Sequence, residues 1–167
     1  NLISSDKFRR IDLSIERVRK YFEENFPGVG CRILEFTESS ATVSLAAQAL
    51  NCEPGRIAKT LSFYGKDGVI LVVAAGTAKI DNKKFKGTFG LKARMLSPED
   101  AENLVGHAVG GVCPFGVNPG VEVYLDNSLK SFETVYPACG SSNSAIELTP
   151  DELEKYSGAK AWVDVCC

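Results

Sequence analysis

The sequence predicts one compact α+β domain with a curved, mixed and largely antiparallel sheet flanked by short helices. Its length of 167 residues is that of a single domain, since domains usually run ~100–200 residues. Hydrophobic residues make up 44% of the chain and charged residues 24%, which is typical of a globular protein with a packed core. Several strand-like runs, joined by hairpins or short helices, indicate the α+β class.

Composition and charge exclude several classes of function. The longest apolar run, residues 69–75, has the length of a buried strand and is far shorter than the ~20 residues that span a membrane. Nineteen Lys and Arg residues against 21 Asp and Glu residues give a net charge of −2, which disfavours coating a nucleic-acid duplex. Contact with one end of a nucleic acid stays open, and no membrane partner is expected.

The six cysteines are expected to be reduced thiols of a cytoplasmic protein. No Cys-x-x-Cys motif occurs, and Cys166 and Cys167 are adjacent and terminal, which suits a structural disulfide poorly. The polar start of the chain does not resemble a signal peptide, so Asn1 is interpreted as a truncated or processed end. We expect residues 1–13 to be an N-terminal extension and residues 14–167 to be the functional domain.

The first predicted element is a helix over residues 14–25, which Pro27 ends. Apolar residues recur along it at helical spacing: Ile11, Ile15, Val18 and Phe22. A second helix is predicted over residues 43–50, with Thr42 or Ser44 as its N-cap.

Strands and shorter helices follow. The strands are predicted at residues 31–36, 56–64, 69–75, 92–95, 121–125, 133–138, 145–148 and 161–165. The second and third of these flank a four-residue turn bounded by glycines, which predicts a hairpin. A short helix is expected over residues 81–88. Ser97 and Thr149, each followed by Pro and acidic residues, predict the N-caps of two more helices.

Lys59 gives the most informative signal of chemistry. In an extended strand Lys59 points to the same side as Ile57 and Leu61, so it lies on an apolar face, where lysine is rarely buried without a partner. A register shift, a bulge or a side chain that reaches water is the ordinary explanation. The functional explanation is a lysine at the mouth of a pocket, where it holds positive charge in a low dielectric.

Two glycine-containing segments are candidate pocket walls. Gly110, Gly111 and Gly116, with Pro114 between them, prevent a regular helix and allow backbone amides to approach a ligand or a developing oxyanion. The turn at residues 140–144 offers further amides and hydroxyls. A hairpin or polar turn without a ligand is the alternative for each segment.

His107 is the only histidine of the chain. A metal site with several histidines is therefore excluded, no Cys/His spacing suits structural zinc, and no Gly-x-Ser-x-Gly motif supports a catalytic triad. We predict no metal and no cofactor. His107 either lines the pocket or packs at a helix end, and Cys113 is interpreted as a small buried thiol rather than a nucleophile.

Three motifs occur in one order along the chain. They are Ile57-Ala-Lys-Thr-Leu61, Gly110-Gly-Val-Cys-Pro-Phe-Gly116, and Gly140-Ser followed by residues 145–153. Together they resemble the YbaK family, the domain associated with prolyl-tRNA synthetase editing, over about residues 14–165. The resemblance implies a mixed α/β domain with a bent, barrel-like sheet. It also implies a free-standing aminoacyl-tRNA deacylase, which hydrolyses the ester between a wrong amino acid and the terminal ribose of tRNA.

The same resemblance implies site residues and partners. Lys59 matches the family's essential lysine, and we expect catalysis to involve Lys59, Gly111 and Ser141. We expect the substrate to be bound by Thr60, His107, Gly110, Pro114, Phe115, Gly116, Gly140 and Ser142. The expected partners are the acceptor end of a mischarged tRNA and, in addition, an aminoacyl-tRNA synthetase.

One departure limits what the resemblance implies about the substrate. Ala145 stands where cysteinyl-tRNA deacylases of the family carry an aspartate, so the resemblance does not extend to that specificity. The attacking group is either water or the substrate's own side chain, and no residue is identified as a general base. The alternative function is a module that binds aminoacyl-tRNA or a nucleotide-like ligand without turnover. A thiol redox protein would need a low-pKa cysteine, which no spacing indicates.

Overall fold

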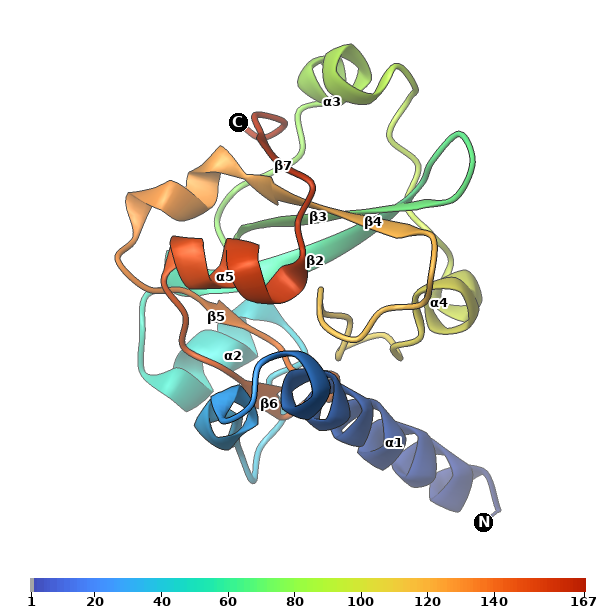
Figure 1. The fold of residues 1–167 in the computed structure, drawn as a ribbon, viewed down its shortest axis with the longest axis vertical. Helices are drawn as coiled ribbons and strands as arrows, with labels where there is room; N and C mark the ends of the chain where they lie inside the picture. The colour runs from blue at the N-terminus through green and yellow to red at the C-terminus, as the bar shows by residue number, and fades with distance from the viewer. Residues whose placement is uncertain (1) are drawn as a thin grey trace.

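The computed structural model describes the backbone of residues 2–167 and the side chains of residues 14–167 (Figure 1). The helices are α1 (Leu2–Asn25), α2 (Val43–Leu50), α3 (Asn82–Phe89), α4 (Pro98–Asp100) and α5 (Pro150–Ser157). The strands are β1 (Leu34–Glu35), β2 (Ile57–Tyr64), β3 (Val69–Ala75), β4 (Val121–Asp126), β5 (Tyr136–Pro137), β6 (Ser144–Ala145) and β7 (Ala161–Val163). These elements confirm the predicted α+β class with a mixed sheet.

Helix α1 begins well before the predicted start at residue 14. The segment before that residue contains neither Pro nor Gly, so nothing in it interrupts a helix. Ile15, Val18 and Phe22 are buried, which confirms the predicted apolar face. The side chain of Ile11 lies outside the described residues. The helix also crosses the predicted boundary between the extension, residues 1–13, and the domain, so that division stays a prediction.

Five strands form the central sheet in the order β5-β2-β3-β4-β7. Strands β2 and β3 pair antiparallel from Ala58 opposite Ala75 to Tyr64 opposite Val69, which confirms the predicted hairpin. The expectation of a largely antiparallel sheet is wrong for this sheet. Its other three pairs, β2–β5, β3–β4 and β4–β7, are parallel.

The strand directions follow from the connections. Between β3 and β4 the chain makes a long crossover that carries α3 and α4, and a crossover returns a strand parallel to its neighbour where a hairpin would return it antiparallel. Strand β5 follows β4 in the chain but pairs with β2 on the other side of the sheet. A second, two-stranded sheet pairs β1 with β6 antiparallel.

Several predicted strands are shorter than expected, among them 133–138, of which only Tyr136–Pro137 is strand, and 145–148, where the strand is Ser144–Ala145. In the segment 31–36, the first residues belong to the 3-10 turn η1 (Val29–Arg32), and only Leu34–Glu35 is strand. In the segment 92–95, a single bridge joins Met95 to Phe63 of β2. The first segment pairs in the separate β1–β6 sheet and the second forms only a bridge to β2 at Phe63, and local apolar patterns do not establish such pairing.

The predicted helix caps are confirmed. Thr42 accepts a hydrogen bond from the backbone amide of Leu45, which begins α2, and Ser97 caps α4 in the same way. The chain continues from α4 into a π-turn, η3 (Ala101–Val105). Thr149 and Glu152 form a reciprocal capping box at the start of α5.

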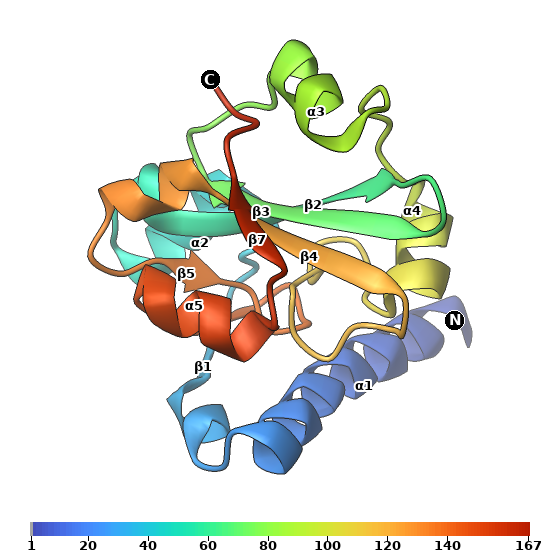
Figure 2. The same cartoon turned by 45° about the horizontal axis from the view of Figure 1, so that its top comes forward.

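Helices lie over both faces of the central sheet (Figure 2). All residues of β3 are buried, as expected of a central strand with helices or loops on either side. Leu71 and Val73 belong to the core cluster that contains Phe22 of α1, and Val72 belongs to the cluster that contains Phe85 of α3. Helix α3 therefore covers one face, while α1 and α5 lie on the other side of the sheet.

Candidate functional site

A cavity of about 300 Å³ opens beside the edge of β2. Strand β5 pairs with β2 only at its first two residues, and the amide of Leu96 reaches the carbonyl of Ser62 further along. Between these contacts Lys59 and Thr60 line the cavity, on the edge of β2 that has no neighbouring strand there. The cavity is therefore formed by a gap in sheet pairing, and its volume is at the small end of the range for ligand pockets.

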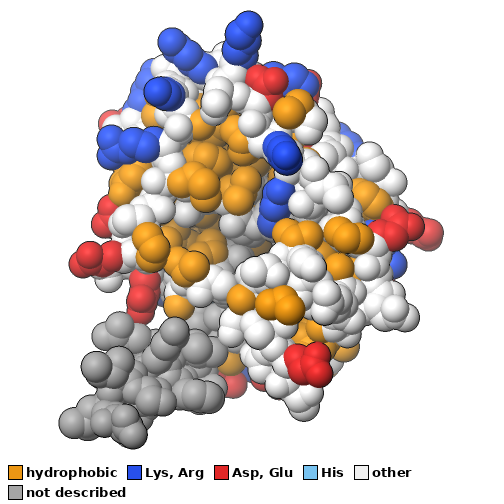
Figure 3. Space-filling model, turned by 180° about the vertical axis from the view of Figure 1, so that it is seen from behind, with side chains coloured by type: hydrophobic (Ala, Val, Ile, Leu, Met, Phe, Trp, Pro, Cys, Tyr) orange, Lys and Arg blue, Asp and Glu red, His pale blue; other side chains and the backbone are white. Residues whose placement is uncertain are grey.

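The cavity wall is mostly apolar. It includes Val43 and Ala46 of α2, Val112 and Ala145, and, at its mouth, Met95 and Val109, which are 57% and 63% exposed. The face opposite to that of Figure 1 shows apolar side chains gathered in a hollow, with Lys and Arg side chains along its border (Figure 3). Among the described lining residues only Lys59 and Tyr136 are ionisable.

Lys59 lies in this wall and is half-buried. Its Nζ donates hydrogen bonds to the carbonyl oxygens of Gly76, at 3.2 Å, and Ala78. An ammonium group has three N–H donors, so one remains for a ligand. Burial lowers the pKa of Lys59, the Cys166 thiol raises it, and the neighbouring charge of Lys79 lowers it further. The site therefore holds a positive charge that is poorly hydrated and can interact strongly with a partial negative charge.

Thr60 supplies an unsatisfied hydroxyl in the same wall. Its Oγ1 is the one buried side-chain oxygen or nitrogen in the described part of the chain that has no hydrogen-bond partner. A buried hydroxyl without a partner is costly and rare. A polar atom of a ligand in the cavity would satisfy it, which supports the prediction that Thr60 contacts substrate.

The two glycine segments lie against each other beside the cavity. A Cβ atom on Gly111 would lie 2.6 Å from the carbonyl oxygen of Gly140, so only glycine allows this contact between the two backbones. Gly110 and Val112 line the cavity, and Gly140 lies against the backbone of Ser14 in α1. The second and third sequence motifs are thus brought together next to the lysine strand.

Ser141 and Ser142 do not line the cavity. Ser141 is 3% exposed, and its Oγ is hydrogen-bonded to Asn143 Oδ1 at 2.9 Å and to Ser144 Oγ at 2.7 Å. The carbonyl of Ser142 accepts hydrogen bonds from the backbone and side chain of Ser40, which is itself in the cavity wall. Both serines hold the turn and the Ser40 loop in place instead of presenting a hydroxyl to the cavity.

Six more expected site residues lie outside the cavity wall: His107, Gly111, Pro114, Phe115, Gly116 and Gly140. Gly116 is partly buried and the others are buried. The Phe115 ring is fully buried 4.9 Å from the ring of Phe22, and Gly116 adopts a positive φ of 61° where the chain passes beneath α1. The sequence motif is therefore only partly a ligand motif, because its second half packs the loop against the helix.

His107 is buried as a neutral side chain. Its Nε2 lies 2.7 Å from the Phe115 carbonyl, which can only accept, so Nε2 carries the proton and Nδ1 accepts from Ser14 Oγ at 2.6 Å. Burial lowers the pKa of His107 to about 4. Of the two roles expected for His107, lining the pocket or packing at a helix end, this geometry matches packing at a helix end.

The buried histidine predicts a pH dependence of stability. The unfolded chain binds a proton at His107 below its ordinary pKa of 6.5, whereas the folded chain does so only below about 4. The free energy of unfolding should therefore fall as the pH decreases from about 6.5 to about 4. Urea unfolding across this window should show the loss in the wild type and a smaller slope in His107→Gln. An equal slope in both proteins would contradict the assignment.

The cysteines near the site are not activated nucleophiles. Cys113 is fully buried, and burial raises its pKa to about 12. Burial also raises the pKa of Cys139 well above its ordinary value. Since the thiolate is the reactive form, neither side chain is suited to nucleophilic or redox chemistry. Cys113 is the small buried thiol expected from the sequence.

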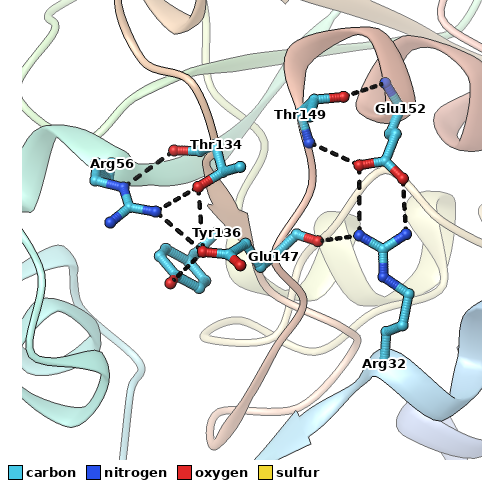
Figure 4. Close-up of polar contacts among 7 residues, drawn as sticks. All are labelled: Arg32, Arg56, Thr134, Tyr136, Glu147, Thr149 and Glu152. Carbon is cyan, nitrogen blue, oxygen red and sulfur yellow. Dashed lines mark hydrogen bonds and ion pairs between the residues drawn. The ribbon is translucent and has the colours of Figure 1, made fainter.

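Tyr136 is a cavity residue that the sequence did not single out. Its hydroxyl donates to Glu147 Oε2 at 2.6 Å, and the Arg56 guanidinium lies 4.9 Å from the centre of its ring (Figure 4). Glu147 Oε2 also accepts from Arg56 and Thr134. In the predicted strand Tyr136 and Ala138 fall on one side, which was the only signal in the sequence that could have identified Tyr136. Nothing local indicated that this side faces a cavity.

A second ion pair, between Arg32 and Glu152, stabilises the segment next to Glu147. Arg32 of η1 contacts Glu152 Oε2 at 2.7 Å and the Glu147 carbonyl at 2.7 Å (Figure 4). The hydrogen bond from Arg32 lowers the pKa of Glu152 to about 2. This pair joins the turn after α1 to the start of α5, and thereby fixes the backbone segment that leads from the Ser141 turn to α5.

No group of three or more His, Cys, Asp or Glu side chains is placed to hold a metal ion within the described side chains. None of the described helices is both long enough and apolar enough to cross a bilayer.

The protein is thus a small α+β domain in which a half-buried lysine, on an edge of the central sheet, lines a ligand-sized cavity. The chain belongs to the aminoacyl-tRNA editing domain family, whose model matches residues 37–156. This range contains the cavity lining and all three sequence motifs. The family expected from the sequence is thereby confirmed.

Individual relatives agree with this membership. The uncharacterized protein YwhH of Bacillus subtilis (strain 168) is 56% identical over 92% of this chain and 98% of its own length. A proline–tRNA ligase of Thermosipho melanesiensis is 27% identical over 80% of this chain but only 23% of its own length. A crystal structure described as a candidate trans-editing enzyme for prolyl-tRNA synthetase superimposes with a TM-score of 0.82, at 33% identity, over 92% of this chain and 97% of that one.

Proposed function

We propose that this protein hydrolyses mischarged aminoacyl-tRNA in trans, with the aminoacyl ester held in the β2 cavity. The observation that carries the proposal is the half-buried Lys59 amine at the edge of a small, mostly apolar cavity. Membership in the aminoacyl-tRNA editing domain family supports a tRNA substrate. Similarity over nearly the full length of a candidate trans-editing enzyme supports action outside a synthetase. An aminoacyl-tRNA synthetase as a second partner stays a prediction.

The proposed chemistry is ester hydrolysis assisted by electrostatics. The free N–H of Lys59 donates to the ester carbonyl oxygen. The supporting backbone donor is assigned to Gly110 in the cavity wall, because the Gly111 amide already donates to the Ala108 carbonyl. Water adds to the carbonyl carbon, the oxygen becomes an oxyanion, and the bond to the ribose oxygen then breaks to release the amino acid and the terminal hydroxyl. Preorganised donors of this kind stabilise the transition state more than the ground state.

The proton of the attacking water needs an acceptor other than a side chain of the described wall. No Asp, Glu or His lines the cavity there. We propose that the neighbouring ribose hydroxyl or a second water carries this proton to the leaving oxygen. A substrate whose side chain holds a nucleophile can instead attack its own ester, which needs no water in the first step.

The cavity favours a small, uncharged amino acid. Ala46, Ala58 and Ala145 leave room for a short side chain, and the described wall has no carboxylate that would pair with a basic one. The unpartnered Thr60 hydroxyl is suited to the amino group or a hydroxyl of the substrate. Pocket size alone separates substrates that differ by one methylene by only ~1–3 kcal/mol, so several small amino acids should be released at graded rates.

The test is amino-acid release from alanyl-, cysteinyl-, seryl- and threonyl-tRNA. We expect at least one of them to be deacylated well above the buffer rate, and tRNAs that carry a bulky or basic amino acid, tested beside them, to be deacylated only at that rate. Intact aminoacyl-tRNA recovered from a stable complex would favour the non-catalytic binding module. Neither release nor binding across the panel would contradict both functions.

A further inference from the structure

Positive charge is concentrated in the crossover between β3 and the cavity. Residues 79–94 contain six cations, in a chain whose net charge is −2. The cations are Lys79, Lys83, Lys84, Lys86, Lys92 and Arg94. The single acid of the segment, Asp81, is occupied as the N-cap of α3, where its carboxylate accepts the amides of Lys83 and Lys84.

The packing of α3 turns most of this charge outward. Phe85 is fully buried in the core cluster below the helix, and Phe89 packs there too, so the lysines occupy the outer side. Lys84 is already paired with Asp164 at 3.0 Å. Lys83 and Lys86 are exposed and make no side-chain hydrogen bond or ion pair with the rest of the described chain. The same is true of Lys79 and Lys92.

The charged segment begins and ends at the proposed active site. Lys79 directly follows Ala78, whose carbonyl accepts a hydrogen bond from Lys59. At the other end Arg94 precedes Met95 in the cavity wall, and its guanidinium lies 4.4 Å from the centre of the Tyr64 ring. A cleft runs beside Tyr64, Lys92 and Arg94. Figure 3 shows Lys and Arg side chains around the upper border of the apolar hollow.

We propose that Lys79, Lys83, Lys86, Lys92 and Arg94 form a basic rim that binds the phosphates of the tRNA acceptor stem. This inference rests on the proposed function, and it adds the position of the acceptor stem on the protein surface. Phosphate contacts position a nucleic acid without reading its sequence, and a local basic surface on an acidic protein restricts them to one orientation. The stem would cross the α3 side of the molecule while its single-stranded end enters the β2 cavity.

The test compares two triple variants in binding uncharged tRNA by fluorescence anisotropy at several salt concentrations. Lys83→Ala/Lys86→Ala/Lys92→Ala should weaken binding at least ~10-fold and lower the salt slope by about one unit for each phosphate that is no longer neutralised. The matched control, Lys20→Ala/Lys130→Ala/Lys155→Ala, removes the same charge from exposed positions outside the rim and should change binding little. Equally weakened binding in both variants, or unchanged binding in the rim variant, would overturn the proposal.

A short substrate separates this inference from the proposed function. The aminoacyl ester of adenosine fills the cavity but has no stem, so the rim variant should hydrolyse it like the wild type while losing activity on mischarged tRNA. Equal losses of activity on both substrates would contradict a stem-binding rim. If neither wild type nor variant hydrolyses any ester, the proposed activity fails, and the anisotropy result still decides where tRNA binds.

Discussion

Lys59→Met is expected to lower the single-turnover rate of tRNA deacylation by ~10²–10³, the usual cost of removing one oxyanion donor. Methionine keeps an unbranched apolar stem in the wall of the cavity but has no charge and no N–H group. Because the basic rim lies outside the cavity, the affinity for tRNA should change little. The measurement is the rate of amino-acid release at saturating enzyme, together with the dissociation constant for uncharged tRNA.

The control for Lys59→Met is Lys155→Met, which removes a lysine charge from the exposed side of α5. It should leave both the rate and the affinity unchanged. Equal rates in Lys59→Met and the wild type would remove Lys59 from the mechanism. A variant that loses tRNA affinity but not the rate at saturation would make Lys59 a binding residue instead.

Gly140→Ala is expected to be among the most destabilising single substitutions in the chain. Gly140 has a φ of +92°, and a Cβ atom there would lie 2.6 Å from the Ser14 carbonyl oxygen and 3.0 Å from Val18. A left-handed backbone costs an L-residue ~1–2 kcal/mol, and forced overpacking typically adds ~1–3 kcal/mol. Urea unfolding should therefore show a loss of about 2–5 kcal/mol.

Gly158→Ala is the matched control for this prediction. Gly158 also has a positive φ, +65°, but nothing lies within 4 Å of the position of its Cβ. Its substitution should cost only the backbone term, ~1–2 kcal/mol. If both substitutions cost the same, the close contact between the Gly140 turn and α1 is not rigid. The wall that holds Gly110 and Gly111 would then be less fixed than described.

Local signals in the sequence predicted the helix caps well, although they did not place the start of α1. The caps at Thr42, Ser97 and Thr149 each depend on a side chain and an amide three residues further on, so the pattern contains all the interacting groups. The same is true of the β2–β3 hairpin, whose turn and alternation are contiguous. The direction of β4 was missed because it depends on a crossover of more than forty residues, and no local pattern records which strand it returns beside.

The candidate site was predictable in part. Lys59 on an apolar face and the glycines at residues 110–111 indicated a pocket for local physical reasons. The structure brings Lys59 and Gly110 to the cavity wall, whereas Gly111 packs against Gly140 behind it. His107 is different, because a polar residue in a glycine-rich loop fits a pocket or the core equally well. Its position in the core is explained by its hydrogen-bond partners: Ser14, which is distant in the sequence, and the Phe115 carbonyl at the other end of the loop.

The scissile ester is proposed to lie beside Lys59 in the β2 cavity. A crystal structure with a non-hydrolysable amide analogue of aminoacyl-adenosine tests it most directly. We expect the aminoacyl group in the cavity, with its carbonyl oxygen within hydrogen-bond distance of Lys59 Nζ and a polar atom next to Thr60 Oγ1. An analogue bound in the polar groove beside Arg17 and Asn118, with the β2 cavity empty, would contradict it.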